Sequence, residues 1–160
     1  MVSVTIEYVI LIPLLFSQMI VFPFVASTMA SSWQDSQRDV ALQEVANHLA
    51  STVQQLYLTI NRDEILWGNI TQFSTLPVAV DSYHYTATAS LSNASDGSAT
   101  ILTVTLTLDE LGNTATAVAV LGTNVNWIDS TFRSNSADAS INVQKLDDTE
   151  QTLVFSFGVD

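Results

Sequence analysis

The pattern of hydrophobic residues divides the chain into two parts. From Tyr8 to Ala30 the sequence runs for 23 residues without a formally charged side chain, and most of these residues are apolar. About 20 apolar residues in a helix, at roughly 1.5 Å rise each, cross the hydrocarbon core of a bilayer. Residues 1–30 therefore predict a transmembrane-length helix that is apolar on all sides.

Residues 31–67 predict an amphipathic continuation of this helix. Apolar residues recur there at steps of three or four, at Leu42, Val45, Leu49, Val53, Leu56 and Ile60. Such spacing places one apolar stripe along a helix. Neither Gly nor Pro interrupts residues 24–67. We therefore predict a single helix from about Val4 to about Ile60, about 85 Å long at roughly 1.5 Å per residue.

Two prolines, Pro13 and Pro23, lie inside the predicted helix. Each removes one helical hydrogen bond, which an apolar bundle tolerates when neighbours satisfy the freed carbonyl group. We expect a local distortion of the helix near one of them.

Residues 68–160 predict a β-rich head. Residues 61–72 end the helix, because Gly68 and several Asn and Asp residues supply stop and turn signals. From Phe73 onward the apolar period becomes two, most clearly at Leu102, Val104, Leu106 and Leu108 and at Leu153, Phe155, Phe157 and Val159.

Further alternating runs occupy residues 83–91, 114–121 and 139–146, with separators at 93–98, 109–113 and 146–150 rich in Gly, Asn and Asp. We expect about six short strands in a twisted antiparallel sheet or small sandwich, part of which covers the helix stripe. The predicted fold class is α+β, with segments 1–30, 31–67 and 68–160.

Charge and chemistry exclude some functions. The chain has 16 acidic and 4 basic residues and a formal net charge of -12, so a nucleic-acid partner is disfavoured. It has no cysteine, and its two histidines, His48 and His84, lack an accompanying nucleophile motif. We expect no catalytic residue, no metal site, no cofactor and no enzymatic activity.

Two sequons match the N-glycosylation acceptor pattern, at Asn69-Ile70-Thr71 and Asn93-Ala94-Ser95. An N-linked glycan belongs on an exposed segment of an externalised protein. Asn69 and Asn93 are therefore candidate glycan carriers.

The N-terminal segment contains one carboxylate, Glu7. A charged side chain in an apolar segment is a functional candidate, although Glu7 of a lone anchor could simply lie at the lipid headgroups. A secretory signal peptide is a competing interpretation. It predicts a basic start and a shorter apolar core, whereas no Lys or Arg precedes Arg38, so we expect the segment to be retained.

The stretch "SVTIEYVILIPLLF" resembles the N-terminal helix of the type IV filament superfamily, which includes archaeal and bacterial type IV pilins, archaellins and tight-adherence pilins. The shared pattern is a glutamate in the first turns followed by a long apolar run with proline and small residues. The resemblance covers residues 1–30 and is strongest to archaeal and tight-adherence pilins. The disulfide-free β-rich head, the sequons and the acid excess are more similar to archaeal members.

In that family a prepilin peptidase removes a short leader, and the mature helices form the filament core. The glutamate at mature position five neutralises a neighbour's N-terminal amine. The resemblance implies this role for Glu7, which is residue seven from Met1; cleavage before Ser3 would restore the spacing. It also implies that the following side chains pack in the filament core: Tyr8, Ile10, Leu14, Leu15, Phe16, Phe22 and Phe24.

The resemblance thus implies a major pilin that forms an extracellular helical homopolymer and is membrane-inserted before assembly. Its partners would be itself, the pilus assembly machinery, and surfaces or other cells. An archaellum subunit is one alternative, although archaellins usually begin with a helix richer in Gly and Ala. A monomeric membrane-anchored binding module is the other.

Overall fold

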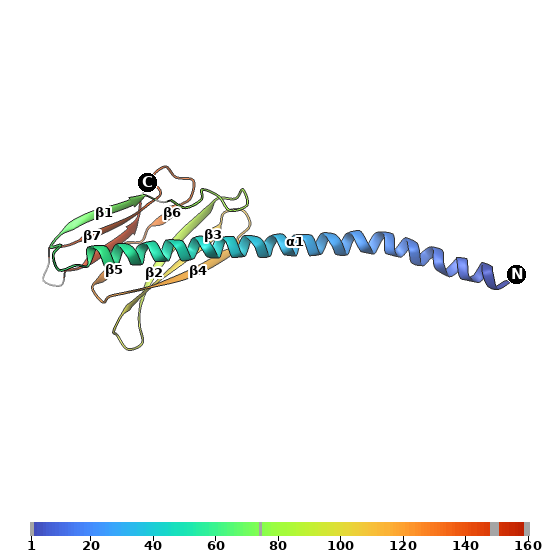
Figure 1. Cartoon of the computed structure of the whole chain (residues 1–160), viewed down its shortest axis with the longest axis horizontal. Helices are drawn as coiled ribbons and strands as arrows, with labels where there is room; N and C mark the ends of the chain where they lie inside the picture. Colours follow the sequence, from blue (N-terminus) through green and yellow to red (C-terminus); the bar gives the residue numbers. More distant parts are fainter. Residues whose placement is uncertain (1, 74, 148–150, 159–160) are drawn as a thin grey trace. The chain divides into compact units, whose positions relative to one another are not determined.

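The computed structural model describes the backbone of residues 2–73, 75–147 and 151–158, and the side chains of these residues from Val9 onward. It confirms the predicted α+β class: one long N-terminal helix is followed by a β-rich region (Figure 1). The chain forms two compact units, Met1–Gln37 and Arg38–Asp160. We call the second the C-terminal unit.

The helix α1 spans Val2–Ile60. Within the C-terminal unit, the predicted stripe is confirmed, because Leu42, Val45, Leu49, Val53, Leu56 and Ile60 are all buried. Ala46 and Ala50 are buried beside them. The second half of α1 is thus an integral part of the fold.

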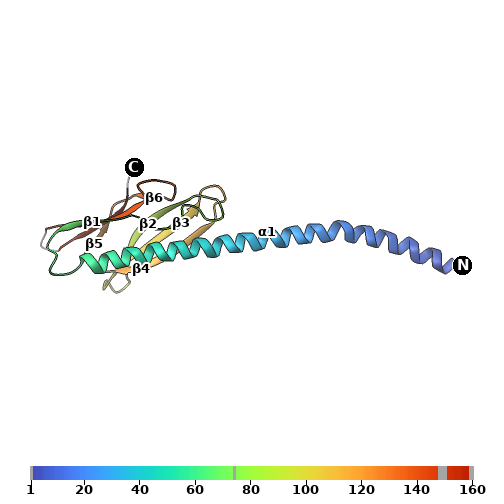
Figure 2. The same ribbon diagram turned by 45° about the horizontal axis from the view of Figure 1, so that its top comes forward.

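Eight strands occur in the described residues: β1 (Gly68–Phe73), β2 (Tyr85–Asn93), β3 (Thr100–Leu108), β4 (Thr114–Leu121), β5 (Val125–Trp127), β6 (Thr131–Arg133), β7 (Ser140–Lys145) and β8 (Leu153–Phe157). They form two four-stranded sheets, with the orders β1-β7-β8-β5 and β4-β3-β2-β6. Figures 1 and 2 show strands of both sheets beside the second half of α1.

The expectation of about six antiparallel strands was wrong in two respects. The strands β1, β5 and β6 were missed, and β5 pairs with β8 in parallel. Two of the missed strands have only three residues each, which is too short to display a period. The third, β1, is an edge strand that begins at Gly68, inside the segment assigned to the helix stop, and most of its residues are exposed.

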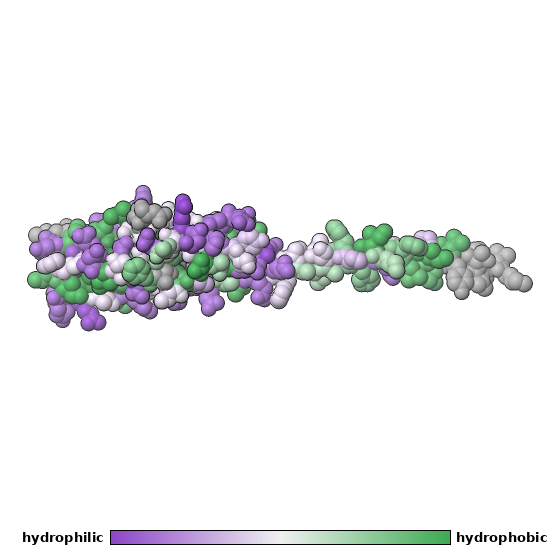
Figure 3. Space-filling model, turned by 90° about the horizontal axis from the view of Figure 1, so that it is seen from above, coloured by the Kyte–Doolittle hydropathy of each residue, from purple (hydrophilic) through white to green (hydrophobic). Residues whose placement is uncertain are grey.

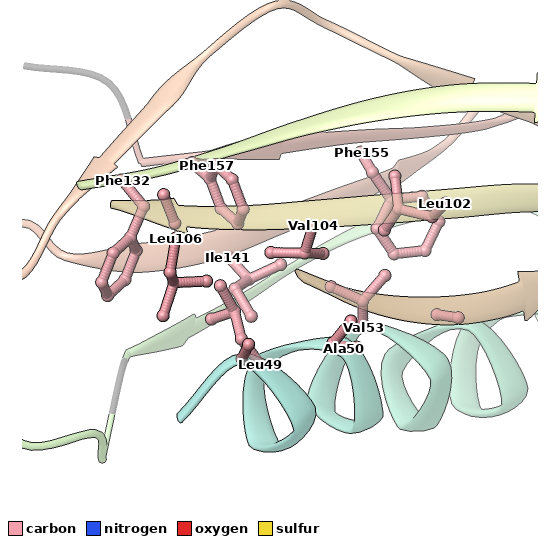
Figure 4. Close-up of a cluster of buried hydrophobic side chains, with 14 of the residues drawn as sticks. Leu49, Ala50, Val53, Leu102, Val104, Leu106, Phe132, Ile141, Phe155 and Phe157 are labelled. Atoms are coloured by element: carbon pink, nitrogen blue, oxygen red, sulfur yellow. The ribbon is translucent and has the colours of Figure 1, made fainter. Parts of the chain in front are cut away.

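One hydrophobic core joins both sheets to the helix. Leu49, Ala50 and Val53 of α1 point toward apolar side chains of β3, β6, β7 and β8 (Figure 4). The predicted alternation in β3 is confirmed, since Leu102, Val104, Leu106 and Leu108 are completely buried. In β8, Leu153, Phe155 and Phe157 are also buried; Val159 lies outside the described residues.

Polar contacts attach the sides and the end of α1 to the strands. Gln43 Nε2 donates a hydrogen bond of 2.7 Å to Thr116 O on the edge strand β4. At the end of the helix, Lys145 Nζ of β7 donates to Arg62 O at 3.0 Å and to Ile60 O at 3.4 Å. A cation at this position satisfies terminal carbonyl groups and complements the helix dipole. Near the start of the C-terminal unit, Arg38 forms a 2.6 Å ion pair with Asp81.

Candidate assembly surface

The first half of α1 carries an apolar surface that the chain itself does not cover. Every large apolar side chain from Val9 to Trp33 is exposed, from 44% for Val25 to 76% for Met19. We call these side chains the apolar helix surface. Figure 3 shows hydrophobic and near-neutral colours along this half, whereas hydrophilic colours are frequent over the C-terminal unit.

The apolar helix surface surrounds the helix. Val9, Ile10, Leu11 and Ile12 are consecutive residues, and all four are more than half exposed. Because consecutive residues of an α-helix are turned by about 100°, they point to all sides. A surface helix of a globular protein has one apolar stripe and one polar face. This helix segment can be sheltered from water only by lipid or by other protein chains.

Hydroxyl groups near the end of this segment bond to the helix backbone. Thr28 Oγ1 donates to Val25 O at 2.9 Å, and Ser31 Oγ donates to Thr28 O at 3.0 Å. Hydroxyl groups satisfied in this way can enter an apolar environment without losing their hydrogen bonds. The segment is therefore compatible with burial among apolar neighbours.

The structure describes most, but not all, of the side chains predicted to pack in a filament core. Six of them belong to the apolar helix surface and are between 52% and 70% exposed: Ile10, Leu14, Leu15, Phe16, Phe22 and Phe24. The side chains of Glu7 and Tyr8 lie outside the described residues, although their backbone is helical. The pairing predicted for Glu7 stays a prediction.

The helix is continuous through Pro13 and Pro23. The described residues of α1 contain no unwound turn at either proline. The local distortion expected near one of the two prolines stays a prediction.

The structure places both candidate glycan carriers at exposed positions. Asn69 lies in β1, opposite Gln144 of β7, and Asn93 ends β2, just before the turn to β3. In that turn, hydrogen bonds from the backbone and hydroxyl of Ser98 lower the pKa of Asp96. Both asparagine side chains are accessible to a modifying enzyme, and the modification itself stays a prediction.

The histidines lie apart from each other in the sequence and in their contacts. His48 lines a cavity of about 240 Å³ between α1 and β1, together with Thr52. Thr52 Oγ1 donates to the backbone oxygen of His48 at 2.8 Å, which is the ordinary contact of a helical threonine. The Thr52 hydroxyl also lies 3.5 Å from Nδ1 of His48. His84 Nδ1 lies 3.0 Å from Val78 O.

The comparisons with known proteins add no assignment, because no family model, no curated protein and no solved structure matches this chain. In the described residues, α1 is one helix long and apolar enough to cross a membrane. That property is shared by membrane anchors and signal sequences.

Sequence reasoning missed two features of the C-terminal unit. No role was predicted for Lys145, the single lysine of the chain, yet it is buried and donates a hydrogen bond to the carbonyl group of Ile60, the last residue of α1. The sequence did carry a signal for this burial, because Lys145 follows Ile141 and Val143 at a spacing of two, on the buried face of β7. The second missed feature is the edge strand β1, next to the exposed Trp67, and its sequence gave only a weak signal.

Proposed function

We propose that this protein is the major structural subunit of an extracellular type IV-like filament and polymerises through the first half of α1. The observation that supports this most is the apolar helix surface, which is exposed on all sides in a chain whose C-terminal unit has a complete core of its own. Exposed apolar patches of this extent mark interaction with a membrane or with protein.

In the proposed filament, apolar helix surfaces of neighbouring copies bury one another. Each Å² of apolar surface removed from water contributes about 25 cal/mol, so bulky side chains such as Phe16 and Phe22 would contribute most. Identical subunits that meet head to tail, with a rotation that does not close, build an open helical polymer. The strands of the C-terminal unit would form the outer surface, which meets solvent, other cells or a substrate.

Glu7 is the proposed register residue of this assembly. A carboxylate among apolar helices needs a partner, and the resemblance implies the N-terminal amine of a neighbouring copy. Before assembly, the same helix would hold the subunit in the membrane, where the prepilin peptidase and the assembly machinery act.

A monomeric membrane-anchored binding module is the second candidate, because the composition of α1 also suits a permanent anchor. The two candidates differ in whether copies associate. An archaellum subunit would assemble in the same way and would differ in what the filament does.

Replacement of Glu7 tests the proposal. We expect Glu7→Leu to reduce the number of surface filaments at least tenfold while the subunit still accumulates in the membrane, because the neighbour's amine would lose its partner. The matched control is Glu44→Leu, which removes an exposed carboxylate from the second half of α1. Filaments are counted by negative-stain microscopy, and membrane subunits by immunoblot. Equal filament numbers in wild type and Glu7→Leu would contradict the proposed role of Glu7.

A further inference from the structure

The strand β1 is an open edge of the C-terminal unit. It is the outermost strand of its sheet and pairs with β7 over its whole length, from Gly68 opposite Lys145 to Phe73 opposite Ser140. In the described part of the chain, no other strand and no side chain bonds to its outer backbone groups. The ribbon views place β1 at the rim of the sheet (Figures 1 and 2). An edge of this kind is a template for another strand.

The usual protections of an edge strand are absent from β1. Its sequence, GNITQF, has no charged residue and no proline, and its ladder with β7 has no bulge. The other edges are different. The strands β5 and β6 have three residues each, and Gln43 bonds to the backbone of β4. The edge strand β4 is longer than β1, but Gln43 occupies its carbonyl group at Thr116, whereas no described side chain bonds to the backbone of β1.

Two aromatic residues suit pairing of this segment with a second copy of itself: Trp67, in the bend just before β1, and Phe73, the last residue of β1. Trp67 and Phe73 are 72% and 66% exposed. They are equally distant from Ile70 in the sequence, so an antiparallel pair of β1 strands centred on Ile70 places Trp67 of each copy opposite Phe73 of the other. Aromatic residues at opposite positions of neighbouring strands stabilise a sheet. A two-fold axis produces this contact twice.

We propose that two copies of this chain associate by antiparallel pairing of β1 with β1, which joins two four-stranded sheets into one sheet of eight strands. A second copy fits this edge because the strand is complementary to itself. Each chain carries a formal net charge of -12, so two copies repel each other overall. The paired β1 strands themselves contain no carboxylate, so this repulsion is not increased within the ladder. This contact is separate from the helix contacts of the proposed filament and does not depend on them.

Lysine substitution at the edge tests the pairing. Thr71→Lys places a charge at an exposed position of β1, and in the pair the two lysines lie near the two-fold axis, where like charges oppose pairing. The matched control is Thr88→Lys, at an exposed position of β2, which is an inner strand between β3 and β6. Both changes add the same charge to an exposed threonine of a strand.

The measurement is hydrogen exchange of the β1 amides in the full-length protein. The protein is made in a host without N-glycosylation, because a glycan on Asn69 would lie beside the ladder, and is kept in detergent at low and high concentration. We expect exchange in residues 68–73 of wild type and Thr88→Lys to slow at least fivefold at high concentration, together with a dimeric mass. In Thr71→Lys the exchange should be the same at both concentrations.

A second variant keeps the test informative if Thr71→Lys does not fold. Trp67→Ala leaves β1 unchanged and removes the aromatic contact, so it should raise the dimer dissociation constant at least threefold. Concentration-independent exchange of the β1 amides in wild type would overturn the pairing. If mass rises with concentration while these amides stay unprotected, association through α1 is the cause; that result refutes the β1 contact and leaves the proposed filament intact.

Discussion

At the scale of single residues, the contacts of Lys145 explain how the chain uses its only lysine. The residue is 2% exposed and lies on the buried face of β7. Its ammonium group donates to the carbonyl group of Ile60, the last residue of α1, which has no partner within the helix. It also donates to the carbonyl group of Arg62, two residues further along the chain. Lys145 thus links the end of the helix to the sheet formed by β1, β7, β8 and β5.

Replacement of Lys145 by methionine should destabilise the C-terminal unit. Methionine keeps most of the apolar stem, but the carbonyl groups of Ile60 and Arg62 lose a charge-assisted hydrogen bond. We expect the free energy of unfolding to fall by about 1–3 kcal/mol, measured by denaturant titration of the full-length protein in detergent. The control Arg133→Ala removes an exposed cation and should change it by less than about 0.5 kcal/mol. Equal effects of the two changes would refute the role of Lys145.

Tyr85 predicts a pH dependence of stability. It is 1% exposed, its hydroxyl donates to Pro77 O at 2.8 Å, and burial raises its pKa to about 12. In the unfolded chain the pKa is about 10, so between pH 10 and 12 the folded state retains a proton that the unfolded state releases. The contribution of Tyr85 is therefore fully present below pH 10 and is lost as pH rises through 12.

Comparison with Tyr85→Phe isolates this effect. Wild type should be more stable than the variant by about 1 kcal/mol at pH 8. As pH approaches 12 the difference should fall by about 2 kcal/mol, so that wild type becomes the less stable of the two. Denaturant titrations of both proteins at several pH values measure this difference. An advantage that does not change with pH would mean that Tyr85 ionises normally in the folded protein.

At the scale of elements, the second half of α1 has one buried and one exposed face. Leu49 is 1% exposed and Leu58 is 63% exposed in the same helix. We expect Leu49→Ala to lower the free energy of unfolding by about 2–5 kcal/mol and Leu58→Ala to change it by less than about 0.5 kcal/mol. Thermal or denaturant unfolding of both variants checks this. Similar losses would show that the two faces are packed alike.

The elements that could be predicted from the sequence are those with a clear hydrophobic period. The stripe from Leu42 to Ile60 and the alternation in β3 extend over many residues, and each buried position there requires an apolar residue. In contrast, β1 is specified mainly by backbone pairing with β7, which leaves little trace in residue type. The contact between Lys145 and Ile60 of α1 joins residues 85 positions apart, so it can be found only from the tertiary structure.

At the scale of the whole molecule, the apolar residues fall into two groups that differ in their exposure to solvent. In the C-terminal unit, many of them are enclosed in a core shared by α1 and both sheets, and others, such as Leu58 and Trp67, are exposed. Those between Val9 and Trp33 are exposed on every side of a helix. This division is what a subunit needs if it folds by itself and then buries its remaining apolar surface among neighbours. The sequence could predict this apolar helix surface, because it follows from composition alone.

The central claim is that this surface becomes the core of a filament, and electron cryomicroscopy of filaments sheared from cells that express the chain tests it most directly. Mass spectrometry of the same preparation identifies the subunit and its N-terminus. We expect helical filaments built of this chain, with density for residues 9–33 packed against the same residues of neighbouring copies. Finding the chain only in the membrane fraction, as monomers, would contradict it.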